Sequence, residues 1–198
     1  MVRYSVSNDQ RQKFYYVFAF ISIALSSLFR LIPYEYINKI TIPTGFAIYG
    51  ILVMIFDKYL WKWRYMASLT KIPNLNGIWK GINTMTDGTN EDLKVTIIQT
   101  WSKIDIIVTT NETISNVTSA SIGIENGKVI TFKYTYTIKP KKRAGNVETT
   151  LTNNLYGEGF TTLWYAPNEN PDHITGTYVS SKYRGGDFKL DRSNHELK

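Results

Sequence analysis

The sequence predicts two structural parts, an N-terminal transmembrane α-helical hairpin and a closed, eight-stranded antiparallel up-and-down β-barrel. Two uncharged apolar runs lie near the N-terminus, and each approaches the roughly 20 residues that a helix needs to cross a bilayer. After Gly77 the apolar pattern changes to the two-residue period of β-strands. We therefore divide the chain into a membrane anchor, residues 1–71, and a β domain, residues 72–198.

The two apolar runs predict transmembrane helices over about residues 14–32 and 40–56. Neither run has the polar face that a helix of a soluble protein needs. A signal peptide would be followed by a small-residue cleavage site, whereas here a second apolar run follows the first. Both runs are slightly short, and the aromatic and basic residues at their ends can extend to the membrane interface.

The basic residues of the anchor predict its orientation in the membrane. Arg3, Arg11 and Lys13 precede the first run, and the segment between the runs offers only Lys39 beside Arg30. Four basic residues follow the second run: Lys58, Lys62, Arg64 and Lys71. The positive-inside rule therefore predicts a multi-pass protein with both termini and the β domain in the cytoplasm.

The positive charge of the chain belongs almost wholly to the anchor. Residues 1–71 hold nine basic and three acidic side chains, whereas residues 72–198 hold 14 basic and 13 acidic ones. A nucleic-acid polymer needs a basic face along its phosphate backbone, so the nearly neutral β domain disfavours that partner. A small anionic ligand, which needs only one or two cations, stays possible. The chain has no cysteine and two histidines, so we expect neither a metal centre nor a cofactor.

Eight strands account for the alternating pattern of the β domain. Asp87-Gly88 is a strong hairpin signal, because glycine accepts the positive φ of primed turns. No long helical pattern follows Lys71, which leaves an up-and-down barrel or a sandwich, and we favour the barrel because closure removes the sheet edges. The predicted strands are residues 78–86, 92–101, 103–109, 116–124, 128–138, 155–165, 173–182 and 186–190.

The motifs of catalysis are missing from the sequence. It has no phosphate-binding P-loop, no Gly-x-Ser-x-Gly elbow and no His-Glu-x-x-His pair. The carboxylates are scattered through turns and polar strand faces, and no two of them form a recognisable acid–base couple. We therefore expect a protein that is not an enzyme.

Aromatic residues and one arginine are the candidate ligand-binding residues. Trp79 opens the first strand and has the place of a residue that closes one end of a barrel. Trp101 is placed either for core packing or for ligand stacking. Five more aromatic residues can either pack in the barrel or line a cavity in which a flat base stacks. They are Tyr134, Tyr136, Tyr156, Trp164 and Tyr178. Arg184 precedes two glycines between the last two strands, where it is either an exposed turn residue or a phosphate ligand.

Several segments, in this order, make the chain resemble the two-transmembrane β-barrel effectors (S-2TMβ, CD-NTase-associated) of bacterial CBASS anti-phage defence. The segments are LWKWR at residues 60–64, IPNLNGIWKG at 72–81, IIQTWSKI at 97–104, GTY at 176–178 and RGGDFKL at 184–190. The resemblance covers nearly the whole chain. Asp187 departs from it, since a threonine is expected at that position.

The resemblance implies a function in abortive infection. A CD-NTase makes a cyclic dinucleotide when phage infects the cell, and the barrel binds it. Binding then drives self-association of the transmembrane hairpins, which disrupts the lipid bilayer of the inner membrane. The residues expected to contact the ligand are Trp101, Tyr134, Tyr136, Tyr178 and Arg184. Two alternatives stay open: a membrane-tethered, lipocalin-like carrier of an apolar small ligand, and a non-binding membrane scaffold protein.

Overall fold

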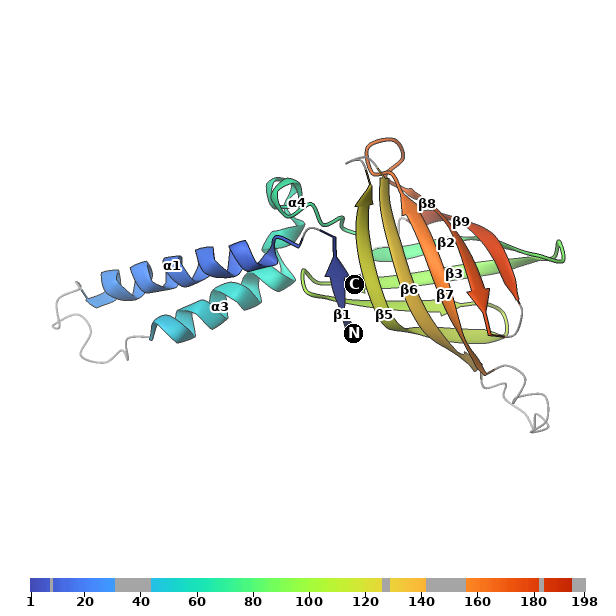
Figure 1. The fold of residues 1–198 in the computed structure, drawn as a ribbon, viewed down its shortest axis with the longest axis horizontal. Helices are drawn as coiled ribbons and strands as arrows, with labels where there is room; N and C mark the ends of the chain where they lie inside the picture. Colours follow the sequence, from blue (N-terminus) through green and yellow to red (C-terminus); the bar gives the residue numbers. More distant parts are fainter. Residues whose placement is uncertain (8, 31–43, 126–128, 142–155, 182–183, 194–198) are drawn as a thin grey trace. The chain divides into compact units, whose positions relative to one another are not determined.

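The computed structural model describes residues 1–7, 9–30, 44–125, 129–141, 156–181 and 184–193 (Figure 1). The chain forms two compact units. One unit contains Asn8–Ile72, and the other contains Met1–Ser7 together with Pro73–Lys198. The first seven residues therefore group with the β domain, although the sequence places them in the anchor. The units are described separately below.

The Asn8–Ile72 unit is helical. Its elements are α1 (Arg11–Arg30), α3 (Gly45–Lys58), the 3₁₀ turn η1 (Leu60–Lys62) and α4 (Arg64–Thr70). The side chain of Thr44 caps α3 by accepting a hydrogen bond from the amide of Ala47 at 3.3 Å. Residues 31–43, which include the ends of both predicted spans, lie outside the described residues.

Helices α1 and α3 pack against each other through aromatic rings and small residues. The Phe56 ring lies 5.5 Å from that of Phe14 and 5.0 Å from that of Phe18. At the other end of the contact, a Cβ atom on Gly45 would lie 3.7 Å from Ser22 and Ser26, so the helices approach closely there. The opposite faces expose apolar side chains: Tyr16, Val17, Phe20, Ile21, Ile23 and Leu28 on α1, and Phe46, Ile51, Met54 and Ile55 on α3.

One described helix can cross a membrane by its length and composition. It is the segment Arg11–Phe29, and 11% of its apolar window is buried within the protein. Helix α3 has 14 residues and is about 21 Å long, which is less than the roughly 30 Å of a hydrocarbon core.

The other unit is a closed β-barrel, as the alternating pattern predicts (Figure 1). From β2 to β9 each strand pairs antiparallel with the next, and β9 pairs with β2. The strands are β1 (Val2–Val6), β2 (Gly77–Met85), β3 (Asn90–Gln99), β4 (Lys103–Thr109), β5 (Thr113–Glu125), β6 (Val129–Pro140), β7 (Gly157–Tyr165), β8 (His173–Ser180) and β9 (Gly185–Ser193).

The prediction of eight strands is wrong by one, because β1 is part of the barrel. Strands β4 and β5 pair directly at only three positions, the last being Ile107 with Asn116. A β-bulge between Val117 and Ser119 then bends β5, and such a bend turns a strand away from its neighbour. Strand β1 fills the resulting gap, pairing antiparallel with β4 and parallel with β5. The barrel thus has nine strands and one parallel pairing.

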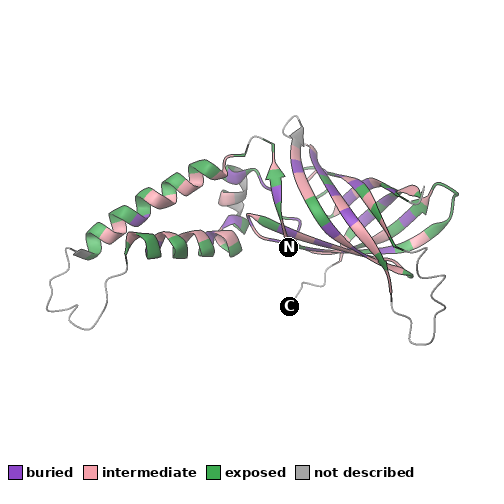
Figure 2. Cartoon of the chain, turned by 60° about the horizontal axis from the view of Figure 1, so that its bottom comes forward, coloured by how far each residue is buried: buried purple, intermediate pink, exposed green. Residues whose placement is uncertain are grey.

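Buried and exposed residues alternate along the strands (Figure 2), as expected when one set of side chains faces the interior of the barrel. At one end this interior is filled, and we call it the plug end. The Trp79 side chain is 0% exposed there, its ring lies 6.3 Å from that of Tyr165, and its indole N–H donates to the carbonyl of Leu75 at 3.0 Å. The Arg192 guanidinium covers the same indole at 4.4 Å. Trp79 therefore closes the barrel, as its position in the sequence predicts.

Gln99 holds together the segments that enter and leave the barrel at the plug end. Its side-chain oxygen accepts a hydrogen bond from the amide of Leu75 at 2.9 Å. Its side-chain nitrogen lies 3.5 Å from the hydroxyl of Tyr4, which donates to the carbonyl of Trp101 at 2.7 Å. Asn76 adds two hydrogen bonds to the Gln99 backbone, at 3.0 and 2.7 Å. These hydrogen bonds join three chain segments at the plug end.

Candidate functional site: the open mouth of the barrel

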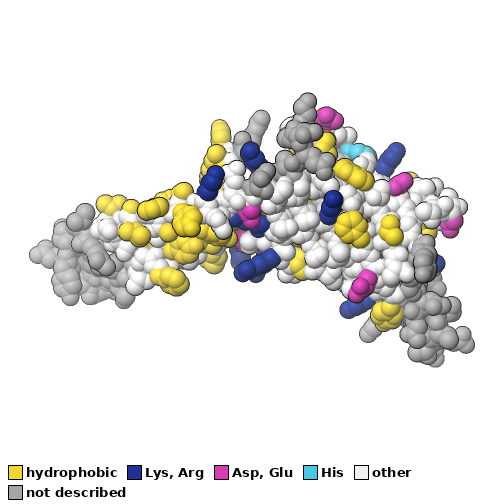
Figure 3. Space-filling model, in the orientation of Figure 1, with side chains coloured by type: hydrophobic (Ala, Val, Ile, Leu, Met, Phe, Trp, Pro, Cys, Tyr) yellow, Lys and Arg dark blue, Asp and Glu magenta, His cyan; other side chains and the backbone are white. Residues whose placement is uncertain are grey.

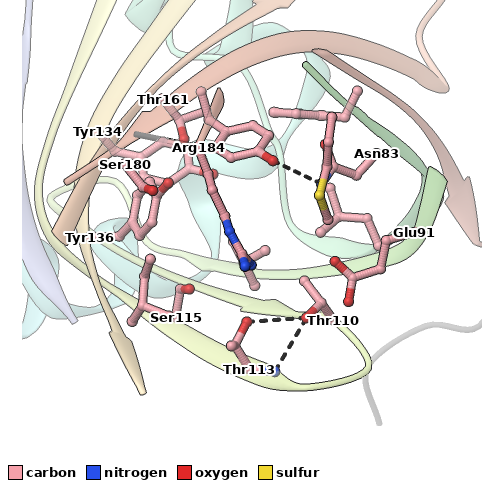
Figure 4. A pocket seen from close by; sticks show the side chains of 16 residues that line it. Asn83, Glu91, Thr110, Thr113, Ser115, Tyr134, Tyr136, Thr161, Ser180 and Arg184 are labelled. Carbon is pink, nitrogen blue, oxygen red and sulfur yellow. Dashed lines mark hydrogen bonds between the residues drawn. The ribbon is translucent and has the colours of Figure 1, made fainter. Parts of the chain in front are cut away.

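The end of the barrel opposite Trp79 holds a cavity, and we call it the mouth (Figure 4). Its empty volume is about 800 Å³, with the part open to solvent counted. Sixteen residues line it: Asn83, Met85, Glu91, Leu93, Val108, Thr110, Thr113, Ser115, Tyr134, Tyr136, Ile138, Thr161, Tyr178, Ser180, Arg184 and Phe188.

Strand register explains why these residues meet. Side chains two apart on a strand share a face, so Trp79 at the plug end places Asn83 and Met85 on the inner face of β2 nearer the mouth. Tyr136 pairs with Gly159, and a Cβ atom on that glycine would lie 2.3 Å from the tyrosine ring. The missing side chain of Gly159 therefore leaves room for the Tyr136 ring.

Tyrosines of β6 form one wall of the cavity. The inner face of this strand carries Phe132, Tyr134 and Tyr136 in succession, with ring centroids 5.8 and 5.9 Å apart. Burial raises the pKa of Tyr134 to about 12. Burial, together with the neighbouring Tyr134 and Tyr178, raises the pKa of Tyr136 further. Both phenols are therefore neutral at physiological pH and can donate as well as accept hydrogen bonds.

Asn83 brings a buried amide to the opposite wall. This side chain is 4% exposed, and its amide nitrogen donates to the hydroxyl of Tyr178 at 3.1 Å. Its amide oxygen is buried and has no protein partner. A buried acceptor without a partner costs about 1–3 kcal/mol, so this position favours a bound donor. If the amide is turned over, its nitrogen is the atom without a partner, and the position favours a bound acceptor.

Arg184 and Glu91 are the charged residues of the lining. Figure 4 shows the Arg184 side chain extending between the wall that carries Tyr134 and Tyr136 and the wall that carries Glu91. The Glu91 carboxylate already accepts a hydrogen bond from the amide of Asn111 at 3.0 Å. Arg184 precedes β9 and is exposed, so its guanidinium is available to an anion at the mouth.

The structure brings four of the five predicted site residues together. Tyr134, Tyr136, Tyr178 and Arg184 all line the cavity. Trp101 lies instead beyond the end of β3, at the plug end, and is 1% exposed. Its carbonyl oxygen accepts a hydrogen bond from the Tyr4 hydroxyl. Tyr156 and Trp164, which the sequence also offered, are exposed and do not line the cavity.

The glycines after Arg184 have a structural explanation within the sheet. A Cβ atom on Gly186 would lie 2.4 Å from the backbone oxygen of Thr84, and one on Gly185 would lie 3.1 Å from that of Tyr178. Both glycines therefore let β9 approach its neighbouring strands closely. This packing accounts for them without a bound phosphate.

Comparison with known proteins identifies the family. Residues 70–192, more than half of the chain, match the family model "Cap15, cyclic dinucleotide receptor domain". A CD-NTase-associated protein 15 from Yersinia aleksiciae is 33% identical over 97 residues, which cover 48% of this chain and 47% of that protein. A CD-NTase-associated protein 15 from Staphylococcus schleiferi is 27% identical over 139 residues, which cover 69% and 70%.

The matched region begins just before β2 and ends within β9, so it contains the mouth and the plug end but neither β1 nor helices α1 and α3. The first alignment spans about half the length of the relative that it matches. The resemblance read from the sequence is confirmed: the chain belongs to the Cap15 family of CBASS effectors, and its β-barrel is a receptor domain of that family.

Proposed function

We propose that the mouth of the barrel binds a cyclic dinucleotide second messenger made by a CD-NTase. The observation that carries the proposal is the combination of Asn83, whose buried amide oxygen has no protein partner, with the lining tyrosines and Arg184. In this proposal a base lies against Tyr134, Tyr136 and Tyr178, and its edge hydrogen-bonds to Asn83. Arg184 contacts a phosphate.

The chemistry of the lining fits such a ligand. Stacking of a base on an aromatic side chain contributes about 1–3 kcal/mol in other systems, and a guanidinium pairs with phosphate through parallel hydrogen bonds. The mouth opens to solvent, so a ligand larger than one base can extend out of the barrel.

The lining disfavours the two alternative functions. A carrier of apolar ligands calls for aliphatic walls, whereas half of the sixteen lining residues are polar and non-aromatic: Asn83, Glu91, Thr110, Thr113, Ser115, Thr161, Ser180 and Arg184. A non-binding scaffold calls for a barrel that is packed throughout, whereas the described residues enclose a cavity at the mouth.

We further propose that the helical unit anchors the protein in the bacterial inner membrane, with both termini and the barrel in the cytoplasm. Helix α1 differs from the core helix of a soluble protein, which is mostly buried, because 11% of its apolar window is buried. Figure 3 shows hydrophobic side chains over the surface of the helical unit, as lipid contact requires. More basic residues flank the pair of apolar runs than lie between the two runs, and this difference supports the orientation.

Ligand binding at the mouth would then drive self-association of the anchors and loss of membrane integrity. A ligand shifts an equilibrium only if it binds one state better than the other, so the assembled state must have the higher affinity. Introducing a charge on the lipid-facing side tests the role of the anchor. Phe20→Arg should abolish ligand-dependent leakage of liposomes and still bind ligand, with an affinity no higher than that of the unmodified protein, whereas Phe20→Leu should behave as the unmodified protein does. Undiminished leakage from Phe20→Arg would contradict the proposal.

Titration calorimetry of the full chain in detergent against a panel of cyclic dinucleotides tests the ligand. We expect one or more members to bind, and we expect Arg184→Gln to weaken that binding about tenfold or more through loss of the charged hydrogen bonds. The matched control is Lys189→Gln, which removes the same charge from an exposed position on β9. No binding across the panel, or equal losses in the two variants, would contradict the proposal.

A further inference from the structure

Strand β1 occupies a gap that the rest of the barrel leaves open. On one side its backbone pairs with the start of β4, at Ile104 and Lys103, and on the other it pairs with residues Ala120, Ser121 and Ile122 of β5. Without β1, these segments of β4 and β5 would be sheet edges with unpaired backbone N–H and C=O groups. Such edges readily pair with another strand. The gap therefore has the properties of a binding site for one extended peptide.

Tyr4 gives this gap a side-chain pocket. The tyrosine is 3% exposed although its neighbours Arg3 and Ser5 are exposed. Its hydroxyl reaches the carbonyl oxygens of Trp101 and Thr100 at 2.7 and 3.2 Å. A strand seated by ladder hydrogen bonds, with one side chain in a pocket, is the pattern by which sheets bind added strands.

Strands β4 and β5 also reach the mouth at their other ends. There the two strands pair directly, and Val108, Thr110, Thr113 and Ser115 line the ligand cavity. Strand β1 thus sets the separation of β4 and β5 at one end, while the cavity lies between side chains of the same two strands at the other. The three directly paired positions of β4 and β5 connect the end that β1 occupies with the mouth.

The chain continues from β1 almost directly into the anchor, since α1 begins at Arg11 and β1 ends at Val6. The amide of Ser7 still belongs to the barrel, donating to the carbonyl of Ile122 at 2.8 Å. The strand that sits between β4 and β5 is therefore the strand that leads to the first helix.

We propose that the gap between β4 and β5 is a strand-binding site whose occupant is Val2–Val6 of the same chain, and that its occupancy is coupled to ligand binding at the mouth. Docked β1 holds β4 and β5 in the arrangement that forms the cavity, so it favours ligand binding. By reciprocity, bound ligand holds β1 more tightly against the barrel. The coupling rests on the proposed function, whereas the strand-binding site does not.

A disulfide trap tests the strand-binding site by itself. The chain has no native cysteine, so an engineered pair reports only its own contact. Ser5 and Ser121 face each other across β1 and β5, at the roughly 5 Å between neighbouring strands, which a disulfide can bridge. We expect Ser5→Cys/Ser121→Cys to form an intramolecular disulfide in the full chain.

The matched control is Ser5→Cys/Lys133→Cys. Lys133 pairs with Ser121 on β6, one strand further along the sheet and about 10 Å from β1, which is too far for a disulfide. No disulfide in the first pair, equal yields in the two pairs, or exclusively intermolecular disulfides would overturn the assignment of β1 to its own barrel.

The coupling is tested with the cyclic dinucleotide that binds best in the calorimetric panel. We expect Tyr4→Ala to weaken its binding by about fivefold or more, and the control Arg3→Ala to leave it unchanged. The oxidised Ser5→Cys/Ser121→Cys chain should bind at least as tightly as the unmodified chain, and ligand should slow hydrogen exchange at the amide of Ser7.

Two outcomes would overturn the coupling: unchanged affinity in a folded Tyr4→Ala chain, or weaker binding by the oxidised disulfide chain. If no cyclic dinucleotide binds the unmodified chain, the proposed function fails, and the disulfide trap still decides whether β1 occupies the gap.

Discussion

The two ends of the barrel are built from the same strands and differ in how their polar groups are satisfied. At the plug end, Gln99 is 2% exposed and its side-chain oxygen is paired with the amide of Leu75. At the mouth, Asn83 is almost as buried, and its side-chain oxygen has no protein partner. Trp79 fills the interior at one end, and a cavity remains at the other.

We infer that the plug end mainly stabilises the barrel and that the mouth is the end available for binding. At the plug end, tight packing and the paired Gln99 amide stabilise the fold and leave little for a ligand to add. An open, incompletely satisfied end has a lower stability of its own and gains more from a bound partner. Substitutions at the plug end should therefore mainly lower stability, and substitutions at the mouth should mainly lower ligand affinity.

Removing the plug should give the largest effect. Trp79→Ala deletes a fully buried indole and leaves a cavity, so we expect the free energy of unfolding to fall by about 3–5 kcal/mol. The control is Trp164→Ala, which removes an indole that is 38% exposed on the outer surface. Urea titration followed by circular dichroism measures both. A loss as large in the control as in Trp79→Ala would contradict the role of the plug.

Alkaline pH should destabilise the barrel through the buried phenols of the mouth. Burial raises the pKa of Tyr134 from 10 to about 12, so the unfolded chain loses this proton at a lower pH than the folded chain. The stabilisation is constant below about pH 10 and is lost as the pH rises towards 12, by roughly 2–3 kcal/mol for this group.

Urea titrations at pH 8 and pH 11 measure this loss, and Tyr134→Phe is the control. The variant has no phenol to titrate at this position, so its stability should fall less between the two pH values. An equal fall in the variant and in the unmodified chain would show that Tyr134 makes no contribution.

A matched pair of buried amides sharpens the comparison. Gln99→Leu leaves the amide of Leu75 buried without a partner, and we expect a loss of about 1–3 kcal/mol. Asn83→Leu removes an amide that already has one unpartnered atom, so its loss of stability should be smaller. Ligand affinity, in contrast, should fall more in Asn83→Leu than in Gln99→Leu. An Asn83→Leu chain that is the less stable of the two and binds ligand normally would contradict this account.

The smallest effect on stability should come from Gly159→Ala at the mouth. The new Cβ atom would meet the end of the Tyr136 side chain rather than backbone, and that ring can turn aside. We expect a loss below about 1 kcal/mol in stability, because the strands need not move. Calorimetry should nevertheless show weaker ligand binding, since the displaced ring alters the cavity. Unchanged binding would remove Tyr136 from the proposed site.

Periodicity and turn chemistry were enough to predict most of the barrel. The predicted Asp87-Gly88 hairpin is formed, but its turn is not a primed one: the loop has three residues, and Gly88 has a positive φ of 84° whereas Asp87 does not. Strand β4 has its predicted bounds. Strand β1 was missed because a five-residue strand before an apolar helix was read as part of the anchor. Its signal was present, since Val2, Tyr4 and Val6 alternate with polar residues.

The site was harder to predict than the fold, because composition does not say which end of a strand a residue occupies. Trp101 and Tyr134 are both buried aromatic residues, and only the register separates the plug end from the mouth. Asn83 was missed altogether. Its signal was the even spacing of four residues from Trp79. That spacing places both side chains on the same face of β2, which is the inner face if Trp79 closes the barrel.

In the proposed function, ligand binds at the mouth and not at the plug end or the outer surface. Photocrosslinking tests it most directly, using a photoreactive derivative of the cyclic dinucleotide selected by calorimetry and the full chain. Mass spectrometry should find adducts on peptides that contain Tyr134, Tyr136, Tyr178 or Arg184, and unlabelled ligand should suppress them. Suppressible adducts confined to the surroundings of Trp79 and Trp101, or to the outer face of the barrel, would contradict it.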